Sequence, residues 1–296
     1  RVSMSESFSG PDAHVVRGVQ TAKNLESLFN LLYEQTLEWY SLHFPELKNV
    51  IRDPGNQLQF MTRVGVRENA NEKTVGLFYT DAESISRVLS ATQTSAGGEL
   101  TPDAMKAIQG AAHAALQLRE EQKTVQSFVV TRMKELAPNF SELATPMIAA
   151  QLLSKAGSLK ELASLPASTI QVLGSEEALR SHIRSKTKSP KHGYLFNHPL
   201  VKPLPKHARG KMARTLSGKL AICIRADYFG KSRIVEGFLP ALEALSRKLA
   251  SSARDTRRSF SPGNRFPERK QSPSSFPNRN SSDRPFSNRT FSDRTR

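Results

Sequence analysis

The sequence predicts an all-α protein with an antiparallel coiled-coil hairpin arm, a compact all-helical domain and a disordered basic C-terminal tail. Three observations support this prediction. Apolar residues recur at helical spacing in two long stretches, shorter segments with helix-capping residues follow, and we find no convincing strand-like alternation of polar and apolar residues. The predicted boundaries are residues 1–13 for a disordered remnant of an N-terminal region, 14–136 for the arm, 137–250 for the compact domain and 251–296 for the tail.

The arm is predicted from two amphipathic stretches on either side of a turn. In the first, which covers residues 14–41, leucine and phenylalanine recur three or four residues apart from Leu25 to Leu37. A shorter pattern predicts a helix over residues 56–66. After the turn, Thr101 is suited to the N-cap and Pro102 to the first position of a helix that runs to Leu136. This arrangement favours a coiled hairpin, although helices of an ordinary bundle show the same periodicity.

The compact domain is predicted from its capping residues. Ser158 with Glu161, and Ser168 with Gln171, match the capping-box spacing, in which each residue caps the other's backbone at a helix start. The glycine at position 174 can end a short helix, and Ser175 can cap the next one. These capping and helix-ending residues therefore predict several short helices.

The tail, residues 251–296, is rich in Ser, Pro, Asn and Arg and repeats a short unit that reads FPER, FPNR, FSNR and FSDR. Such a composition buries too little apolar surface to fold alone. Arginine with spaced phenylalanine is suited to loose contact with single-stranded RNA through charge and stacking. The composition fits a solubilising linker equally well.

Positive charge is concentrated in one block. The whole chain has 43 Lys and Arg against 27 Asp and Glu, a net charge of +16, which favours a polyanionic partner. No carboxylate lies between Glu177 and Asp227. The block holds Arg180, Arg184, Lys186, Lys188, Lys191, Lys202, Lys206, Arg209, Lys211, Arg214, Lys219 and Arg225. A block of one sign within a folded region predicts contact with phosphates, and a merely solvated basic face is the alternative.

A helix predicted to start near Gly210 separates apolar from cationic residues. At about 100° per residue one arc holds Met212, Leu216, Leu220, Cys223 and Ile224, and another holds Lys211, Arg214 and Arg225. We expect the first arc to pack in a core and the second to face an anion. Arg209, Gly210 and Lys211 are predicted to lie at the helix N-terminus, where free backbone N–H groups also bind anions.

The histidines of the block raise the question of metal binding or catalysis. His182, His192, His198 and His207 match no common zinc spacing, and no acid lies among them. No phosphate-binding glycine-rich motif is present, and Cys223 is predicted to be a core residue. We therefore predict a protein that is not an enzyme and that uses no metal or cofactor. A His/Lys-dependent RNA-processing enzyme and a general basic nucleic-acid-binding protein stay open as alternatives.

Several uncommon strings occur together in a defined order. They are EWYSLHFPEL at residues 38–47, APNF at 137–140, AGSLKELASLPASTIQVLG at 156–174, PKHGYLFNHPLV at 190–201, RGKMAR at 209–214 and KLAICIRADYF at 219–229. In these strings the chain resembles the Nop-domain family, and in particular the archaeal counterparts of the nucleolar Nop proteins of box C/D RNA–protein complexes. The resemblance covers residues 12–229.

The resemblance implies a non-catalytic scaffold in the archaeal cytoplasm. Such proteins self-dimerise through the coiled coil, and their Nop domain binds a kink-turn guide RNA together with a ribosomal-type protein already on that RNA. An N-terminal domain recruits fibrillarin, the 2′-O-methyltransferase. The RNA-facing residues are then predicted to be Arg184, Lys186, Lys188, Lys191, His192, Lys206, Arg209, Lys211 and Arg214. The residues facing the partner protein are predicted to be Gln171, Gly174, Glu176, Glu177 and Arg180.

The chain departs from the family pattern in three places. Only residues 1–13 precede the coiled-coil match, so the N-terminal domain is expected to be largely missing and fibrillarin recruitment is left open. Glu177 stands where the family has a lysine, and Arg180 stands where it has a phenylalanine. The Phe/Arg tail differs from the Lys/Glu-rich tails of eukaryotic members.

Overall fold

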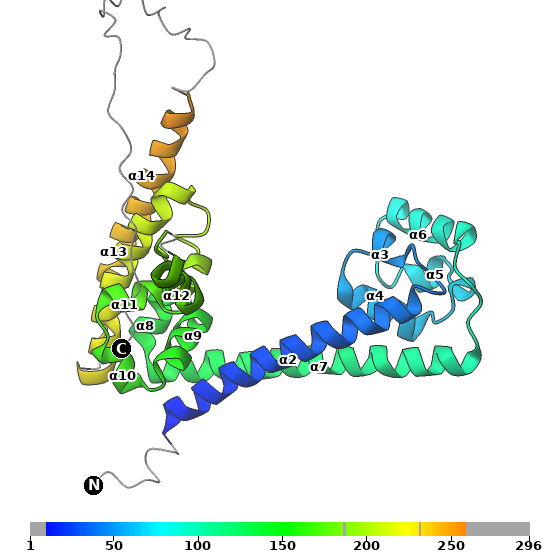
Figure 1. Cartoon of the computed structure of the whole chain (residues 1–296), viewed down its shortest axis with the longest axis horizontal. Coiled ribbons are helices and arrows are strands. Elements are labelled where there is room, and N and C mark those ends of the chain that lie inside the picture. Colours follow the sequence, from blue (N-terminus) through cyan, green and yellow to red (C-terminus); the bar gives the residue numbers. More distant parts are fainter. Residues whose placement is uncertain (1–9, 186–187, 231, 259–296) are drawn as a thin grey trace, which may run out of the picture. The chain divides into compact units, whose positions relative to one another are not determined.

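The computed structural model describes residues 10–185, 188–230 and 232–258, and side chains as far as Ser251. Within these ranges the regular secondary structure is helical and no strand occurs, which confirms the predicted all-α class. The helices fall into a hairpin arm with a small helical module at its end, followed by the compact domain (Figure 1).

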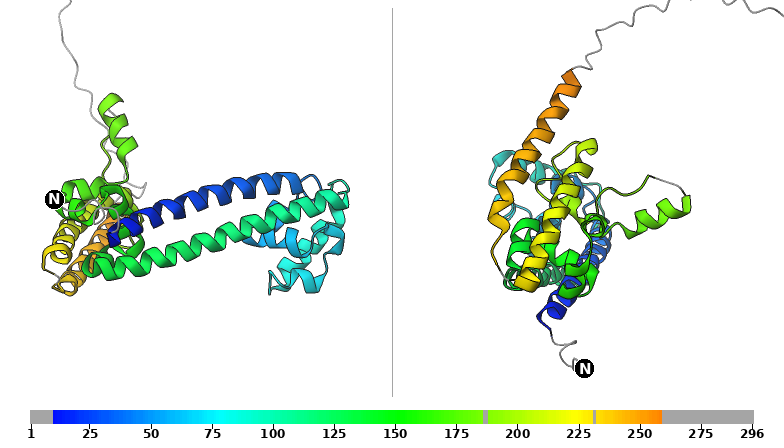
Figure 2. Two further views of the ribbon diagram at one scale, coloured as in Figure 1. Left: turned by 90° about the horizontal axis from the view of Figure 1, so that it is seen from below. Right: turned by 90° about the vertical axis from the view of Figure 1, so that its left-hand side faces the viewer.

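The arm consists of α2 (Pro11–Tyr40) and α7 (Pro102–Leu136), which lie side by side (Figure 2). They are antiparallel, because Gly18 near the start of α2 lies against Val129 near the end of α7. The bounds of α7 match the prediction, and the Thr101 hydroxyl accepts the Ala104 N–H at 3.3 Å as a cap. Helix α2 starts earlier than predicted, so residues 11–13 are helical and not part of a disordered remnant. Its first position holds a proline, which is already restricted to a helical φ.

Between the two arm helices lies a module whose short helices went largely unpredicted: α3 (Leu47–Val50), α4 (Pro54–Arg63), α5 (Glu72–Val75) and α6 (Ala82–Thr94). Only α4 was expected, and it begins two residues early because Asp53 caps it by accepting the Asn56 N–H at 2.9 Å. Tyr40, Phe44 and Phe60 are fully buried in the core of this module.

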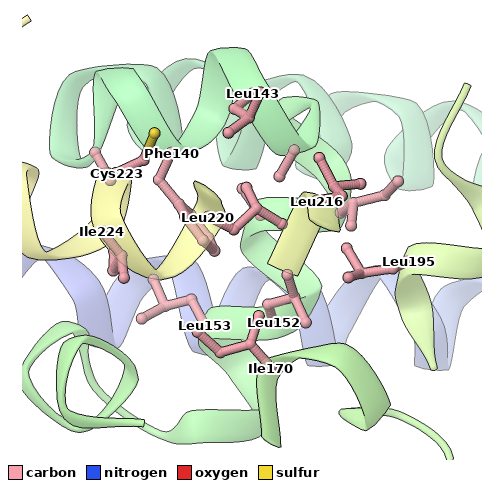
Figure 3. Close-up of a cluster of buried hydrophobic side chains, with 14 of the residues drawn as sticks. Phe140, Leu143, Leu152, Leu153, Ile170, Leu195, Leu216, Leu220, Cys223 and Ile224 are labelled. Atoms are coloured by element: carbon pink, nitrogen blue, oxygen red, sulfur yellow. The ribbon is translucent and has the colours of Figure 1, made fainter. Parts of the chain in front are cut away.

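The compact domain contains α8 (Pro138–Ala144), α9 (Pro146–Ala156), α10 (Leu159–Ser164), α11 (Ala167–Val172), α12 (Glu176–Ser185), α13 (Lys206–Arg225) and α14 (Leu239–Arg258). Its core is shown in Figure 3, where Phe140, Leu152 and Leu153 meet Leu220 of α13. The buried set extends into the base of the arm and includes Val15, Val19, Val129 and Met133. The base of the arm and the compact domain therefore share one core.

The capping predictions had mixed outcomes. Ser158 caps α10 by accepting the Glu161 N–H at 3.1 Å, which confirms the Ser158 half of the predicted capping box. The Ser168–Gln171 prediction is wrong, because α11 begins directly after Pro166 and both residues lie inside that helix. Pro166 provides the extended backbone that precedes the helix, so no serine cap is used.

A buried carboxylate connects the start of α8 with the end of α13. Asp227 accepts hydrogen bonds from the backbone N–H of Asn139 at 3.1 Å, from the Asn139 side-chain amide at 2.7 Å and from the Phe140 N–H at 2.8 Å. It follows α13 in a π-helical turn, η3 (Ala226–Gly230). The last helix, α14, ends at Arg258, so residues 251–258 are helical although the sequence analysis assigned them to the tail. The rest of the predicted tail lies outside the described residues.

Candidate nucleic-acid interface

Helix α13 supplies most of the candidate interface, and its start differs from the prediction. It begins at Lys206, after Pro205 as N-cap, and not near Gly210. The Arg209 N–H already donates to the Pro205 carbonyl at 3.2 Å. The predicted anion site made of free N–H groups at positions 209–211 is therefore wrong. The predicted apolar arc is confirmed, since Met212, Leu216, Leu220, Cys223 and Ile224 are all fully buried.

The structure brings the two basic motifs of the sequence together around a cavity of about 290 Å³. Its lining consists of Gln171, Lys191, His207, Gly210, Lys211 and Arg214. The Lys191 stem lies directly over Gly210, where an added β-carbon would be 3.3 Å from Lys191 Cβ and 3.2 Å from its Cδ. The helix has no side chain at Gly210 and therefore allows this close approach. PKHG and RGKMAR thus form two walls of one cavity.

Two hydrogen bonds to Gln171 hold the Lys191 segment against α11. The Gln171 side-chain amide donates to the Lys191 carbonyl at 2.6 Å, and the Gly193 N–H donates to the Gln171 carbonyl at 3.0 Å. A β-carbon at Gly193 would collide with the Leu173 carbonyl oxygen, so this position requires glycine. Gln171 is buried, and its side chain is bonded to Lys191 within the domain. This differs from its predicted role in facing a partner protein.

The cavity is rimmed by unneutralised positive charge. Lys191, Lys211 and Arg214 are exposed, and none has a carboxylate within 4.0 Å among the residues that the structure describes. Cations that converge without a counter-charge raise the local concentration of anions and favour a bound phosphate. His207, which was not among the predicted RNA-facing residues, also lines the cavity. Its place one helical turn before Lys211 is the sequence signal that could have added it to the candidate residues.

Arg209 is oriented differently from the other cations. Its Nε donates to the Leu204 carbonyl at 2.6 Å and its terminal nitrogen to the Lys202 carbonyl at 3.3 Å. The guanidinium also lies 5.0 Å from the centroid of the Phe196 ring, which in turn lies 5.1 Å from the His192 ring. Arg209 and His192 therefore both pack on Phe196 in the segment before α13, and neither lines the cavity.

Three of the remaining predicted RNA-facing residues are not among those that line the cavity. Arg184 is exposed near the end of α12, Lys188 follows that helix, and Lys206 is exposed in the first turn of α13. Lys186 lies outside the described residues.

Helix α12 carries the rest of the predicted partner-facing set. It buries none of its residues, and Leu179 and Ile183, one turn apart, are 38% and 73% exposed. Glu177 and Arg180 are exposed on the same helix. An amphipathic helix with an uncovered apolar stripe is typical of a surface that binds another macromolecule.

Gly174, in the turn before α12, and Glu176, the first residue of that helix, are the other two predicted partner-facing residues. Gly174 has a φ of +87°, and the Glu176 carboxylate accepts its N–H at 2.8 Å and pairs with Lys155 at 3.3 Å. Partial burial acts to raise the pKa of Glu176, but the Gly174 hydrogen bond and Lys155 outweigh it and the pKa is lowered. Both residues are thus engaged within the domain.

The geometry of His198 and Cys223 fits structural roles. His198 is buried between the Leu143 carbonyl, 2.8 Å from Nε2, and the Leu200 N–H, 3.1 Å from Nδ1. Burial raises the pKa of the Cys223 thiol to about 12. In the described part of the chain, no group of three or more His, Cys, Asp or Glu is arranged to hold a metal ion. No helix of that part combines the length and apolarity needed to cross a membrane.

Comparison with known proteins places these features in a family context. Residues 21–249 match the family model described as "Nop: snoRNA binding domain, fibrillarin". The chain is 36% identical over 240 residues to an uncharacterized NOP5 family protein of Methanocaldococcus jannaschii, which covers 80% of this chain and 58% of the relative. It is 32% identical over 222 residues to nucleolar protein 58 of Candida albicans, covering 75% of this chain and 43% of the relative.

The chain therefore spans about half the length of these relatives. Among solved structures, it is similar to a chain in a crystal structure of a fibrillarin/Nop5p complex. The TM-score is 0.47 and the identity 25%, and the match covers 83% of this chain and 72% of that one.

Proposed function

Because the chain belongs to the Nop family, we propose that it is a non-catalytic scaffold of an archaeal box C/D ribonucleoprotein. In this role it binds a kink-turn guide RNA together with the ribosomal-type protein already on that RNA. The observation that carries the proposal is the cavity of α13, where Lys191, Lys211 and Arg214 converge without a counter-charge. A phosphate of the RNA backbone is the ligand that this set of donors suits.

Helix α12 is the surface that we assign to the ribosomal-type protein. Its exposed Leu179 and Ile183 need an apolar partner, whereas Glu177 and Arg180 beside them offer one charge of each sign. A mixed surface of this kind suits a protein better than it suits nucleic acid. The cavity and α12 then bind the two components of one RNA–protein complex.

Helix α2 offers a surface for self-association. Leu28, Leu31 and Trp39 are exposed and fall within an arc of about 80° at 100° per residue, on the side away from the buried residues of α2. An exposed apolar stripe on a long helix is suited to helix-to-helix packing with a second copy. We propose that the protein dimerises through this face of the arm.

Fibrillarin completes the proposed complex. The description of the matching family model names fibrillarin, and this supports a scaffold that serves fibrillarin-catalysed 2′-O-methylation of ribosomal or transfer RNA. A pull-down of fibrillarin with the full chain tests this part of the proposal. Recovery of fibrillarin only with a longer family member would refute it for this chain.

The central experiment is a binding titration on kink-turn RNA, with and without the ribosomal-type protein, over a series of salt concentrations. The proposal expects tight binding only when that protein is present, with log K falling against log salt at a slope near −4 if about five phosphates are contacted. Binding that ignores the partner protein would contradict the scaffold role. Equal affinity for duplex DNA would favour a general nucleic-acid-binding protein, and RNA cleavage abolished by His192→Ala would favour an enzyme.

A pair of substitutions locates the RNA contact. Lys211→Ala removes a cation of the cavity and should reduce the salt slope by about 0.9. The matched control is Lys202→Ala, since Lys202 is an exposed lysine of the same basic block whose side chain does not line the cavity. Equal effects of the two substitutions would mean that the basic block acts as a diffuse surface and that the cavity is not the site.

A further inference from the structure

A polar contact connects the arm to the loop that carries Lys191. The Lys23 ammonium of α2 donates to the Tyr194 hydroxyl oxygen at 3.0 Å and lies 5.1 Å from the centroid of its ring. The two residues are 171 positions apart, so only the fold brings them together. No carboxylate of the described residues lies within 4.0 Å of Lys23, so its charge is directed at the tyrosine.

Tyr194 lies where the Lys191 segment meets the end of α11. Its N–H donates to the Leu173 carbonyl at 2.8 Å, and this bond follows the one from the Gly193 N–H to the Gln171 carbonyl. Its ring lies against Gly174, where an added β-carbon would be 2.6 Å from two ring carbons. The Tyr194 ring therefore covers the left-handed turn that leads into α12.

A displacement of Tyr194 would be transmitted to the cavity. Lys191 lies three residues before it, and the Lys191 carbonyl is held by the side chain of Gln171, which itself lines the cavity. We infer that Lys23 is a positioning residue for this cavity, which acts through Tyr194 to hold the Lys191 wall at its distance from α13. The inference rests on the proposed function, in which the cavity binds a phosphate of the kink-turn RNA.

The expected effect follows from the kind of contact that is lost. A hydrogen bond with a charged donor contributes modestly to a conformational equilibrium, so RNA affinity should fall about 3- to 10-fold without Lys23 or without the tyrosine hydroxyl. Lys23 itself is expected to make no phosphate contact. The salt slope of binding should therefore stay at its original value, whereas loss of a direct contact would reduce it by about 0.9.

The test measures the affinity of the full chain for kink-turn RNA that carries its ribosomal-type protein, over a salt series. The variants are Lys23→Met, which keeps most of the aliphatic stem, Tyr194→Phe, which keeps the ring on Gly174, and the double variant. Lys23→Arg should restore affinity, because its guanidinium can still donate to the hydroxyl. Lys106→Met is the matched control, since Lys106 is an exposed lysine of the arm helix α7 whose side chain has no hydrogen bond or ion pair among the described residues. Thermal unfolding of each variant confirms that it is folded.

The outcomes distinguish the positioning role of Lys23 from the proposed function. Equal losses for Lys23→Met and Tyr194→Phe, with no further loss in the double variant and an unchanged salt slope, would support the positioning role. A reduced slope in Lys23→Met, additive losses, or affinities equal to that of the unaltered chain would overturn it and leave the proposed function standing. If the unaltered chain does not bind the RNA–protein complex, the proposed function fails and the positioning role fails with it.

Discussion

Replacement of Asp227 tests whether the buried carboxylate joins α8 to the end of α13. Asp227→Ala leaves the backbone N–H groups of Asn139 and Phe140 without their acceptor, at 3.1 and 2.8 Å in the unaltered protein. The Asn139 side chain keeps a second acceptor, the Ser232 carbonyl at 2.8 Å. Two orphaned buried N–H groups cost about 1–3 kcal/mol each, and release of the carboxylate from burial offsets part of this. We expect the free energy of unfolding to fall by about 3 kcal/mol.

A nearly isosteric substitution refines the test. In Asp227→Asn one oxygen becomes an NH₂ group, which cannot accept and must face either Asn139 or Phe140. We expect about half of the loss seen for alanine, because one side of the pairing survives. The assay is unfolding in denaturant at an unchanged m-value. Asp81→Asn at the exposed cap of α6 is the control and should lose less. A loss below about 1 kcal/mol for Asp227→Ala would refute the bracing role.

Three further predictions follow from single residues. Thr145 has a φ of +69°, so Thr145→Gly should raise the free energy of unfolding by about 1 kcal/mol, because relief of strain exceeds the entropy that glycine adds to the unfolded chain; destabilisation in denaturant would contradict this. Burial lowers the pKa of His198 below its ordinary 6.5, although the Leu143 hydrogen bond opposes this. The contribution of His198 to the free energy of unfolding is therefore full above pH 6.5 and is lost as pH falls toward the lower folded pKa. His198→Asn should flatten the pH dependence of the free energy of unfolding, and the control His113→Asn, at an exposed position, should not. The Cys223 thiol, with its pKa raised to about 12, should react with a thiol reagent at pH 8 only after unfolding, and rapid labelling of the folded protein would show that the core is open.

Local signals predicted the parts of the fold where chain chemistry alone sets a boundary. Thr101 and Pro102 open α7 and Pro138 follows its end, so both ends were predictable from residues next to each other in sequence. The module between α2 and α7 was largely missed because its helices are four to thirteen residues long and depend on burial around Tyr40 and Phe60. Helices this short are held by tertiary packing rather than by propensity.

The predictions for the site show the same division. The acid-free block and the apolar arc of α13 are properties of sequence spacing, and the predicted buried face is confirmed. The predicted cationic arc is divided: Lys211 and Arg214 line the cavity, whereas Arg225 donates to the Ala163 carbonyl at 3.1 Å. The start of α13 was misplaced because Gly210 is unfavourable inside a helix and was interpreted as its beginning. Its actual use, as the surface on which the Lys191 stem lies, depends on a segment nineteen residues away.

The helical class, the length of α7, the family and the sign of the surface charge could be predicted from the sequence, because they depend on periodicity, composition and local caps. Which cations converge depends on the tertiary fold. It placed Lys191, Lys211 and Arg214 on one cavity, and it turned Arg209 and Gln171 toward backbone carbonyls. The physical reason is that a donor points at whichever acceptor the fold brings within about 3 Å, and spacing along the chain carries no information on that distance.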